Sequence, residues 1–254
     1  MRIDNLLLER GLVDSRAKAQ ALVMAGDVRV SGQVILKSSD LVDPEMQIEV
    51  REKPRYVSRG GEKLEAALEK FSIDADGKIC ADVGASTGGF TDCLLQHGAA
   101  RVFAIDVGKG VLHWKLRKDA RVVAMEQTNA RYVESLPEMI HLAVVDASFI
   151  SLKILLPRIM QWMEAGGLIL CLVKPQFEAG RKEAGRGEGV IRKPEIHRQV
   201  LAEIIEFAER LGLGVLGLMR SPIKGPKGNV EFLLELGGQA KNVNSEAYLT
   251  ELGL

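Results

Sequence analysis

Short apolar runs alternate with helical stretches from Lys78 to the end of the sequence, and this alternation restricts the folds open to the chain. The runs predicted as strands are KICADV, RVFAIDV, VVAMEQT, LAVVDAS, GLILCLV, GVLGLMR and NVEFLLEL. The clearest helices are predicted at Gly89 to His97, Leu152 to Glu164 and Pro194 to Leu211. Strands rich in Val, Ile and Leu between helices are typical of a parallel sheet with both faces covered. We therefore predict an α/β fold with a Rossmann-like, doubly wound sheet.

The composition is that of a globular protein, since 46% of the 254 residues are apolar and 27% are charged. Lys plus Arg equals Asp plus Glu at 34 each, so a polyanionic partner has to be inferred from local clusters of charge. The cysteines Cys80, Cys93 and Cys171 lack metal-ligand spacing. This favours reduced, buried thiols and no metal site.

Neither a membrane-spanning segment nor a secretion signal is visible. The longest apolar runs, such as LILCLV from Leu168 to Val173, are far shorter than a membrane span. The N-terminus lacks the apolar core of a signal peptide. We therefore expect a soluble, cytoplasmic protein with no membrane partner.

The first 59 residues differ in pattern from the rest and are predicted to form a small α+β domain. Two short amphipathic helices are expected, with Ser15 capping the second and with Gly11 and Gly26 after their ends. Short strands follow at VRV and QIEV. The apolar residues expected on the helix faces are Ile3, Leu6 and Leu7 on the first and Ala17, Ala21, Leu22 and Met24 on the second.

The segment REKPRYVSRGGEK, from Arg51 to Lys63, separates the two parts of the sequence. It contains Pro54, Gly60 and Gly61, and we interpret it as the linker between domains. The predicted domains are residues 1–59 and residues 60–254.

The stretch ADVGASTGGFTDCLL, from Ala81 to Leu95, is predicted as the end of the first strand of the sheet, a glycine-rich turn and the start of a helix. Doubly wound sheets bind ligands at the carboxyl ends of their strands. A nicotinamide dinucleotide is typically bound by G-x-G-x-x-G, whereas the glycines here have the spacing G-x-x-x-G-G. This spacing favours S-adenosylmethionine, whose methionine end and sulfonium pass close over the backbone.

Acidic residues at strand ends support a cofactor site. Asp82 precedes the turn and is expected to face the cationic amino-acid part of the cofactor. Asp106 ends the next strand and is expected to accept both ribose hydroxyls, a feature that dinucleotide-binding proteins share. Glu126 and Gln127 end the third strand, where a contact with adenine is expected from a weaker signal. The predicted cofactor-binding residues are Asp82, Gly84, Ser86, Gly88, Gly89, Phe90, Asp106, Glu126 and Gln127.

Four charged residues occupy positions that a purely structural role explains poorly. Asp146 ends the fourth strand and Lys174 ends the fifth. Glu231 begins the last strand, which the tight GPKGN turn predicts to be antiparallel, so that its start lies at the same sheet edge. Lys63 precedes the helix LEAALEKF that leads into the sheet. A single lysine after LILCLV could simply reach the surface, but four such residues indicate a catalytic site.

Five motifs lie along nearly the whole chain: S-R-G-G-x-K-L at 58–64, D-V-G-x-S-T-G-G-F-T at 82–91, D-A-S-F-I-S at 146–151, K-P-Q-F-E at 174–178 and G-N-x-E-F at 228–232. Together they resemble the TlyA branch of the FtsJ-like ribose methyltransferases. The resemblance implies an S-adenosylmethionine-dependent rRNA cytidine 2′-O-methyltransferase. It places the family's Lys-Asp-Lys-Glu tetrad on Lys63, Asp146, Lys174 and Glu231. Members of this branch have also been labelled haemolysin.

The pattern R-I-D-x-L-L-x-x-R-G-L, followed by S-R-x-x-A-x-x-L-V-x-x-G-x-V-x-V-x-G, resembles the alpha-L RNA-binding motif over about the first fifty residues. In that family, basic residues on the helices face RNA phosphates and recognition is mainly by shape. The resemblance implies rRNA or a ribosomal subunit as the partner, although each basic residue alone could be a solvated surface charge. The matching residues are Arg2, Arg10, Arg16 and Lys18, with Arg29 and Lys37 nearby.

The tetrad can be given a physical role. A ribose 2′-hydroxyl is a weak acid and a weak nucleophile, so methyl transfer needs a base and an in-line arrangement. Lys174 can act as the base only when neutral, a state that burial and Lys63 favour and that Asp146 and Glu231 oppose. We expect the two carboxylates to orient the lysines and the hydroxyl, and Lys63 to stabilise the developing oxyanion.

The stretch from Glu178 to Glu195 contains four glycines and five Lys or Arg residues. We expect it either to close over RNA beside Lys174 or to be an uncommitted surface loop.

Other functions fit the sequence less well. A base methyltransferase is disfavoured because DASF lacks the prolines of the D/N-P-P-F/Y motif that grips an amine. A membrane-damaging haemolysin would need an amphipathic or membrane-spanning segment, and the sequence shows neither. An RNA-binding ribosome assembly factor with an inert methyltransferase fold is disfavoured by the intact tetrad.

Overall fold

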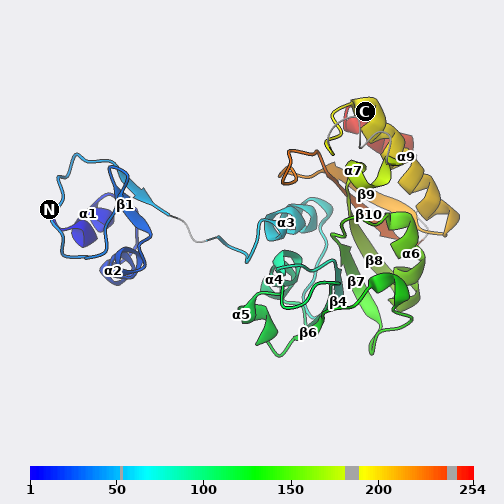
Figure 1. Cartoon of the computed structure of the whole chain (residues 1–254), viewed down its shortest axis with the longest axis horizontal. Helices are drawn as coiled ribbons and strands as arrows, with labels where there is room; N and C mark the ends of the chain where they lie inside the picture. The colour runs from blue at the N-terminus through cyan, green and yellow to red at the C-terminus, as the bar shows by residue number, and fades with distance from the viewer. Residues whose placement is uncertain (52–53, 181–188, 239–244) are drawn as a thin grey trace. The chain divides into compact units, whose positions relative to one another are not determined.

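The computed structural model describes residues 1–51, 54–180, 189–238 and 245–254 (Figure 1). They form two compact units, Met1–Pro54 and Arg55–Leu254. Residues 181–188, at the centre of the Gly-rich basic stretch noted above, lie outside the described residues.

The small unit combines two helices with a short antiparallel sheet. Its elements are α1 (Ile3–Glu9), α2 (Arg16–Met24), β1 (Val28–Val30), β2 (Gln33–Val34) and β3 (Ile48–Val50), and the strand order is β2-β1-β3. Ser15 caps α2, because its side chain accepts a hydrogen bond from the backbone N–H of Lys18 at 3.3 Å. Gly11 and Gly26 follow the helices with φ values of 67° and 75°. The cap, both helix ends and two of these strands are as predicted, whereas β2 is too short to give a sequence pattern.

The buried face of α2 differs from the predicted one. Ala19 and Val23 are buried, and Leu22 packs against them from a half-buried position. Ala17 and Ala21 are exposed, and Met24 is 74% exposed. A helix turns by about 100° per residue, so moving the apolar stripe by two positions places it on nearly the opposite face. The prediction was therefore wrong for Ala17, Ala21 and Met24 but right for Leu22. The other helix, α1, buries Ile3, Leu6 and Leu7 as expected.

The described part of the large unit contains a seven-stranded sheet with the order β6-β5-β4-β7-β8-β10-β9. Its strands are β4 (Ile79–Val83), β5 (Arg101–Ile105), β6 (Val122–Met125), β7 (Ile140–Val145), β8 (Met163–Val173), β9 (Gly214–Arg220) and β10 (Phe232–Gly237). The strands β4 to β8 pair in parallel, and β10 is antiparallel to both of its neighbours. The predicted strands and the antiparallel last strand are thus confirmed.

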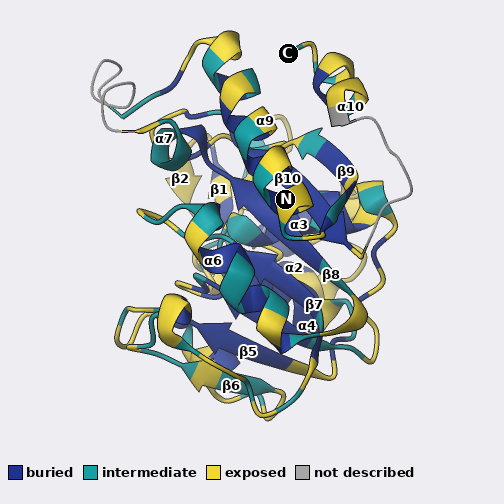
Figure 2. Cartoon of the chain, turned by 90° about the vertical axis from the view of Figure 1, so that its right-hand side faces the viewer, coloured by how far each residue is buried: buried dark blue, intermediate teal, exposed yellow. Residues whose placement is uncertain are grey.

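Helices cover both faces of this sheet, as a doubly wound fold requires. The helices are α3 (Gly60–Phe71), α4 (Gly89–Gln96), α5 (Trp114–Arg117), α6 (Leu152–Ile159), α7 (Pro175–Glu178), α9 (Pro194–Arg210) and α10 (Ser245–Glu251). Residues of α6, α9 and α10 belong to the core on one face, and residues of α3, α4 and α5 belong to the core on the other. Figure 2 shows the central strands buried between helices whose outer sides are exposed. The three cysteines are free and buried, as expected.

The helix predicted at Leu152 to Glu164 is shorter in the structure. It ends at Ile159, a 3-10 turn follows over Met160–Trp162, and β8 already begins at Met163. Trp162 anchors the turn, because its ring is buried and its Nε1–H donates to the carbonyl of Val133 at 3.1 Å. This tertiary contact ends the helix, and the local pattern did not reveal it.

The two units divide after Pro54, five residues before the predicted boundary. Tyr56 is only 3% exposed, and the backbone N–H of Val57 donates to Asp92 on α4 at 2.9 Å. The second half of the predicted linker therefore packs on the large unit. It leads directly into α3, so Lys63 lies within the first turns of that helix rather than before it.

Gly61→Ala is expected to destabilise the large unit, because the added Cβ would lie 2.2 Å from Cγ of Tyr56. Overpacking of this kind typically costs about 1–3 kcal/mol. Gly60→Ala is the control, since its Cβ would meet Ser58 and Phe90 at 3.4 and 3.5 Å. Both tryptophans, Trp114 and Trp162, belong to the large unit, so urea unfolding can be followed by their fluorescence. Equal midpoints for the two variants would contradict the prediction.

Candidate active site

Two adjoining hollows lie at the carboxyl ends of β4, β5 and β7. The first has a volume of about 270 Å³, and its lining includes Asp106, Asn129, Ser148 and Phe149. The second has a volume of about 220 Å³, and its lining includes Ser58, Lys63, Asp82 and Phe90. Gly84, Ser86 and Asp146 line both. Because β4 lies between β5 and β7, this is the point where the order of the strands reverses, and ligands bind at such points.

Gly84 lets the turn after β4 approach the end of β7. Its φ is 85°, a value that favours glycine, and a Cβ at this position would lie 2.8 Å from the carbonyl oxygen of Asp146. Backbone cannot move aside as a flexible side chain can. Any other residue at position 84 would therefore separate the two strand ends.

Gly88 and Gly89 are also required by contacts within the protein. A Cβ on Gly88 would lie 2.2 Å from Leu116, and one on Gly89 would lie 2.2 Å from Ser58 Oγ. Space for a cofactor is therefore not needed to explain these two glycines. Because these two positions lack a side chain, α4 can pack closely against α5 and against the S-R-G-G segment.

Asp82 is fully buried, and only one of its two carboxylate oxygens accepts hydrogen bonds from the described residues. Its Oδ2 accepts hydrogen bonds from the backbone N–H and the hydroxyl of Thr91, at 2.8 and 2.6 Å. Its Oδ1 has no hydrogen-bond partner among the described residues. Burial raises the pKa of Asp82 to about 7. A cationic ligand group in the second hollow would satisfy Oδ1 and favour the ionised carboxylate.

Asp106 lies in the wall of the first hollow and joins two loops. Its Oδ2 accepts the backbone N–H of Ser86 at 2.8 Å, and its Oδ1 accepts that of Gly108 at 2.7 Å. Each carboxylate oxygen can accept a further hydrogen bond. Asp106 is thus held in place and still able to accept hydroxyl groups.

Glu126 and Gln127 do not line either hollow. The carboxylate of Glu126 accepts the backbone N–H groups of Gly110, Val111 and Leu112 at 3.0 to 3.3 Å, and it pairs with Arg117. These interactions lower the pKa of Glu126 to about 2. The structure therefore gives Glu126 a loop-anchoring role. Glu126 and Gln127 were expected to contact the adenine, but the wall of the first hollow at this strand end is formed by Thr128, Asn129 and Ala130. The sequence analysis missed these three residues.

The four predicted catalytic residues meet as two ion pairs. Lys63 Nζ lies 2.6 Å from Glu231 Oε2, and Lys174 Nζ lies 2.6 Å from Asp146 Oδ1. The register of β10 on β8 pairs Phe232 with Val173, so the residues that flank this pair, Glu231 and Lys174, meet at the same edge. The Gln176 amide donates to the other oxygen of Glu231 at 3.5 Å.

The loop after β7 adds two residues that the sequence analysis did not single out. Lys174 Nζ donates to the carbonyl of Asp146 at 3.3 Å and to Ser148 Oγ at 3.0 Å. Phe149 is 89% exposed, has a φ of 63°, and its ring centre lies 4.8 Å from that of Phe177. Ser148 and Phe149 both belong to the D-A-S-F-I-S motif, and this motif was the feature of the sequence that could have revealed them.

Comparison with known proteins identifies the family. The model of the FtsJ-like methyltransferases matches residues 56–237. The protein named 16S/23S rRNA (cytidine-2′-O)-methyltransferase TlyA of Mycobacterium tuberculosis is 43% identical over 242 residues, which cover 94% of this chain and 90% of that protein. The chain belongs to the TlyA family of FtsJ-like methyltransferases.

Other relatives of this TlyA-family protein carry a different name. Hemolysin A of Brachyspira hyodysenteriae is 41% identical over 92% of this chain and 98% of its own length. The solved structure of a Streptococcus thermophilus protein named as a possible hemolysin is 42% identical, covers 99% of this chain and 94% of its own, and has a TM-score of 0.74. The S4 domain model matches residues 1–48, which are the alpha-L motif of the small unit.

The S4 domain of this TlyA-family protein holds two of its predicted RNA-binding residues on one buried carboxylate. Arg2 donates to both oxygens of Asp4, at 3.0 and 2.9 Å, and Arg16 Nε donates to Oδ2 at 3.1 Å. Gln20 donates to the same oxygen at 3.1 Å. These donors hold the pKa of Asp4 well below its usual range. Asp4 thus brings Arg2 and Arg16 together and limits their mobility.

The remaining predicted RNA-binding residues lie apart from this cluster. Arg10 donates to the carbonyl of Met46 at 3.0 Å, which ties the end of α1 to the segment before β3. Lys18 pairs with Asp14 at 3.2 Å, and Arg29 donates to the carbonyl of Gly32 at 3.3 Å. All three side chains are exposed. No hydrogen bond or ion pair found among the described residues joins their side chains to those of Arg2 or Arg16.

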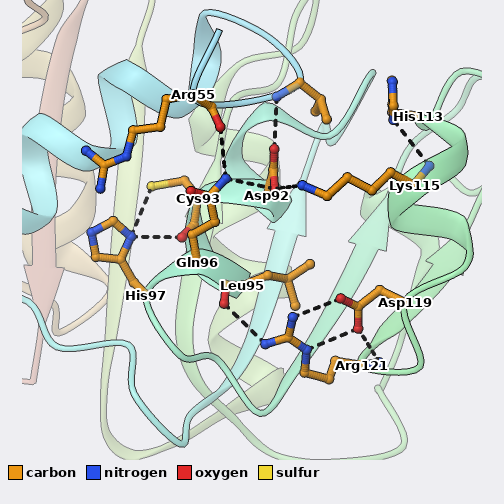
Figure 3. Close-up of polar contacts among 11 residues, drawn as sticks. Arg55, Asp92, Cys93, Leu95, Gln96, His97, His113, Lys115, Asp119 and Arg121 are labelled. Carbon is orange, nitrogen blue, oxygen red and sulfur yellow. Dashed lines mark hydrogen bonds and ion pairs between the residues drawn. The ribbon is translucent and has the colours of Figure 1, made fainter. Parts of the chain in front are cut away.

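Asp92 fixes α4, which follows the glycine turn, to two neighbouring segments (Figure 3). Its carboxylate accepts the backbone N–H of Val57 at 2.9 Å, the amide of Gln96 at 3.1 Å and the amine of Lys115 at 3.4 Å. Gln96 also donates to the carbonyl of Arg55 at 3.0 Å. The chain that enters the large unit and the short helix α5 are thus anchored on the helix that carries the cofactor turn.

Proposed function

We propose that this protein transfers the methyl group of S-adenosylmethionine to the ribose 2′-hydroxyl of a cytidine in rRNA. The observation that carries the proposal is that the second hollow is lined by one residue from each ion pair, Asp146 of the pair with Lys174 and Lys63 of the pair with Glu231. The substrate follows from the name of the M. tuberculosis relative. We assign the activity to the cytoplasm, where ribosomes are assembled.

The hollows fit S-adenosylmethionine. Asp106 in the first hollow would accept the ribose hydroxyls, and the largely apolar wall around it suits an adenine ring. The unused Oδ1 of Asp82 in the second hollow would accept the ammonium of the methionine end. The bound cofactor would supply an electrophilic methyl carbon on a sulfonium.

Lys174 is the proposed general base. Lys174 would first have to release the proton that it carries in its ion pair with Asp146. As the ribose oxygen takes the methyl group, the hydroxyl proton would then move to the neutral amine of Lys174, and the cofactor would leave as a neutral thioether. Asp146, already within 2.6 Å, pairs with the ammonium that forms. Lys63, whose position is fixed by Glu231, adds positive charge near the developing oxyanion.

The S4 domain is proposed to bind the structured rRNA around the target. Arg2, Arg10, Arg16, Lys18 and Arg29 would contact phosphates, which gives affinity and register without sequence reading. We expect a folded rRNA region or a ribosomal subunit as the substrate.

A haemolytic activity is the alternative that the name of the Brachyspira relative raises. Among the described residues, no helix is long and apolar enough to cross a membrane. Leakage of dye from phospholipid vesicles by the pure protein, without rRNA or cofactor, would favour that alternative. The intact tetrad favours the methyltransferase over an inert assembly factor.

Affinity for S-adenosylmethionine is expected to rise with pH up to about 7, because only ionised Asp82 can pair with the cofactor ammonium and burial raises its pKa to about 7. Below that pH each unit should weaken binding by up to about tenfold. Asp82→Asn should bind more weakly and lose this pH dependence. Calorimetry between pH 5.5 and 8 measures the cofactor affinity of the wild-type protein and of Asp82→Asn. If the affinity of the variant changed with pH as steeply as that of the wild type, the assigned role of Asp82 would be excluded.

Lys174→Ala is expected to slow single-turnover methyl transfer by roughly 10² to 10⁴ while leaving cofactor affinity nearly unchanged. Lys174→Arg should fail almost as badly, since a guanidinium keeps its charge and does not deprotonate in proteins. The assay uses tritiated cofactor and saturating rRNA. A near-normal rate for Lys174→Arg would make Lys174 an electrostatic residue and not the base.

A further inference from the structure

The amine of Lys174 has two hydrogen-bond acceptors among the described residues, and one loop supplies both. They are the carbonyl oxygen of Asp146 at 3.3 Å and the hydroxyl of Ser148 at 3.0 Å. The third close neighbour, Asp146 Oδ1, lies within 2.6 Å but without hydrogen-bond angles, so this approach is an ion pair. The amine thus has three close oxygen neighbours, two that accept hydrogen bonds and one that pairs with its charge.

A substitution can remove one of these two acceptors but not the other. The carbonyl of Asp146 is set by the backbone, since the N–H of the same residue donates to Val83 at the end of β4 at 2.9 Å. The hydroxyl of Ser148 is a side chain and can be removed alone. A lysine side chain has four rotatable bonds, and its charge pair with Asp146 does not fix the direction of an N–H, so losing one of the two hydrogen bonds lets the amine turn.

The hydroxyl of Ser148 has no evident part in stabilising the loop. The hydrogen bonds that hold the end of this loop are made by other residues. Ser151 caps α6 by accepting the N–H of Lys153 at 3.1 Å. The carboxylate of Glu178 accepts hydrogen bonds from the Ser151 hydroxyl at 2.6 Å and from the N–H of Leu152 at 2.8 Å. Ser148 itself is exposed at the first hollow. Among the described residues, the hydroxyl of Ser148 bonds to Lys174 and to no group of its own loop.

We propose that Ser148 is a positioning residue for methyl transfer. Its hydroxyl accepts one N–H of Lys174 and the carbonyl of Asp146 accepts another, which would orient the third position on the nitrogen, beside Asp146 Oδ1, toward the ribose hydroxyl. The inference rests on the proposed function, in which Lys174 is the base. It acts through Lys174 and needs no contact between Ser148 and either substrate.

Ser148→Thr and Ser148→Val form a matched pair, because the two side chains have the same shape and only Thr keeps the hydroxyl. Ser148→Val should slow single-turnover transfer by about tenfold to 10²-fold, the range expected when a base is misplaced by up to an ångström. Ser148→Thr should stay close to the wild-type rate. The KM for rRNA and the Kd for S-adenosylmethionine should be unchanged in both variants.

A double-mutant cycle tests whether Ser148 acts through Lys174. In a Lys174→Ala background, Ser148→Val should cause no further loss of the residual rate. The inference is overturned if Ser148→Val is as fast as Ser148→Thr, if its defect lies only in KM or Kd, or if it slows Lys174→Ala further. If the wild-type protein transfers no methyl group, the proposed function fails together with the inference. If the wild-type protein is active and only the Ser148 variants depart from expectation, the inference alone fails. The two failures can therefore be told apart.

Discussion

The site depends on how closely the turn after β4 approaches the end of β7. Gly84 has a φ of 85°, and a Cβ there would lie 2.8 Å from the carbonyl oxygen of Asp146. The N–H of Asp146 bonds to Val83 at 2.9 Å, which holds the two strand ends at this distance. Because Gly84 and Asp146 line both hollows, the proposed cofactor surface and the proposed catalytic surface form one wall. The cofactor and Lys174 can therefore be positioned together by the backbone of the sheet.

The two ion pairs at this wall differ in their surroundings. In the pair of Lys63 and Glu231 the side chains are 10% and 2% exposed, so either charge left alone would be costly, by roughly 3–5 kcal/mol for a buried pair. In the other pair Asp146 is 24% exposed and faces the hollows. The two lysine side chains are themselves equally buried, at 10% exposed each, so the difference lies in their carboxylate partners. Burial alone therefore does not distinguish the proposed base, Lys174, from the proposed fixed charge, Lys63.

The strands, their directions and the meeting of the tetrad could be predicted from the sequence because they depend on periodicity and on chain direction. An antiparallel last strand was enough to bring Glu231 to the edge where Lys174 lies. Contacts between elements could not be predicted in this way. Glu126 is turned toward a loop and Arg117, and Ser148 accepts a hydrogen bond from Lys174, a residue of another strand end. In α2 the amphipathic spacing was assigned to the wrong face, and Ala19 is buried instead of Ala17.

The most direct test of the account is to locate the methyl group. Ribosomal RNA lacking the modification is incubated with the protein and S-adenosylmethionine, and ribose methylation is mapped at nucleotide resolution by resistance to alkaline hydrolysis and by mass spectrometry of the digested nucleosides. The account predicts 2′-O-methylcytidine at a discrete position, formed by the wild-type protein and nearly absent with Lys174→Ala. A methyl group on a base, or equal ribose methylation by the two proteins, would contradict it.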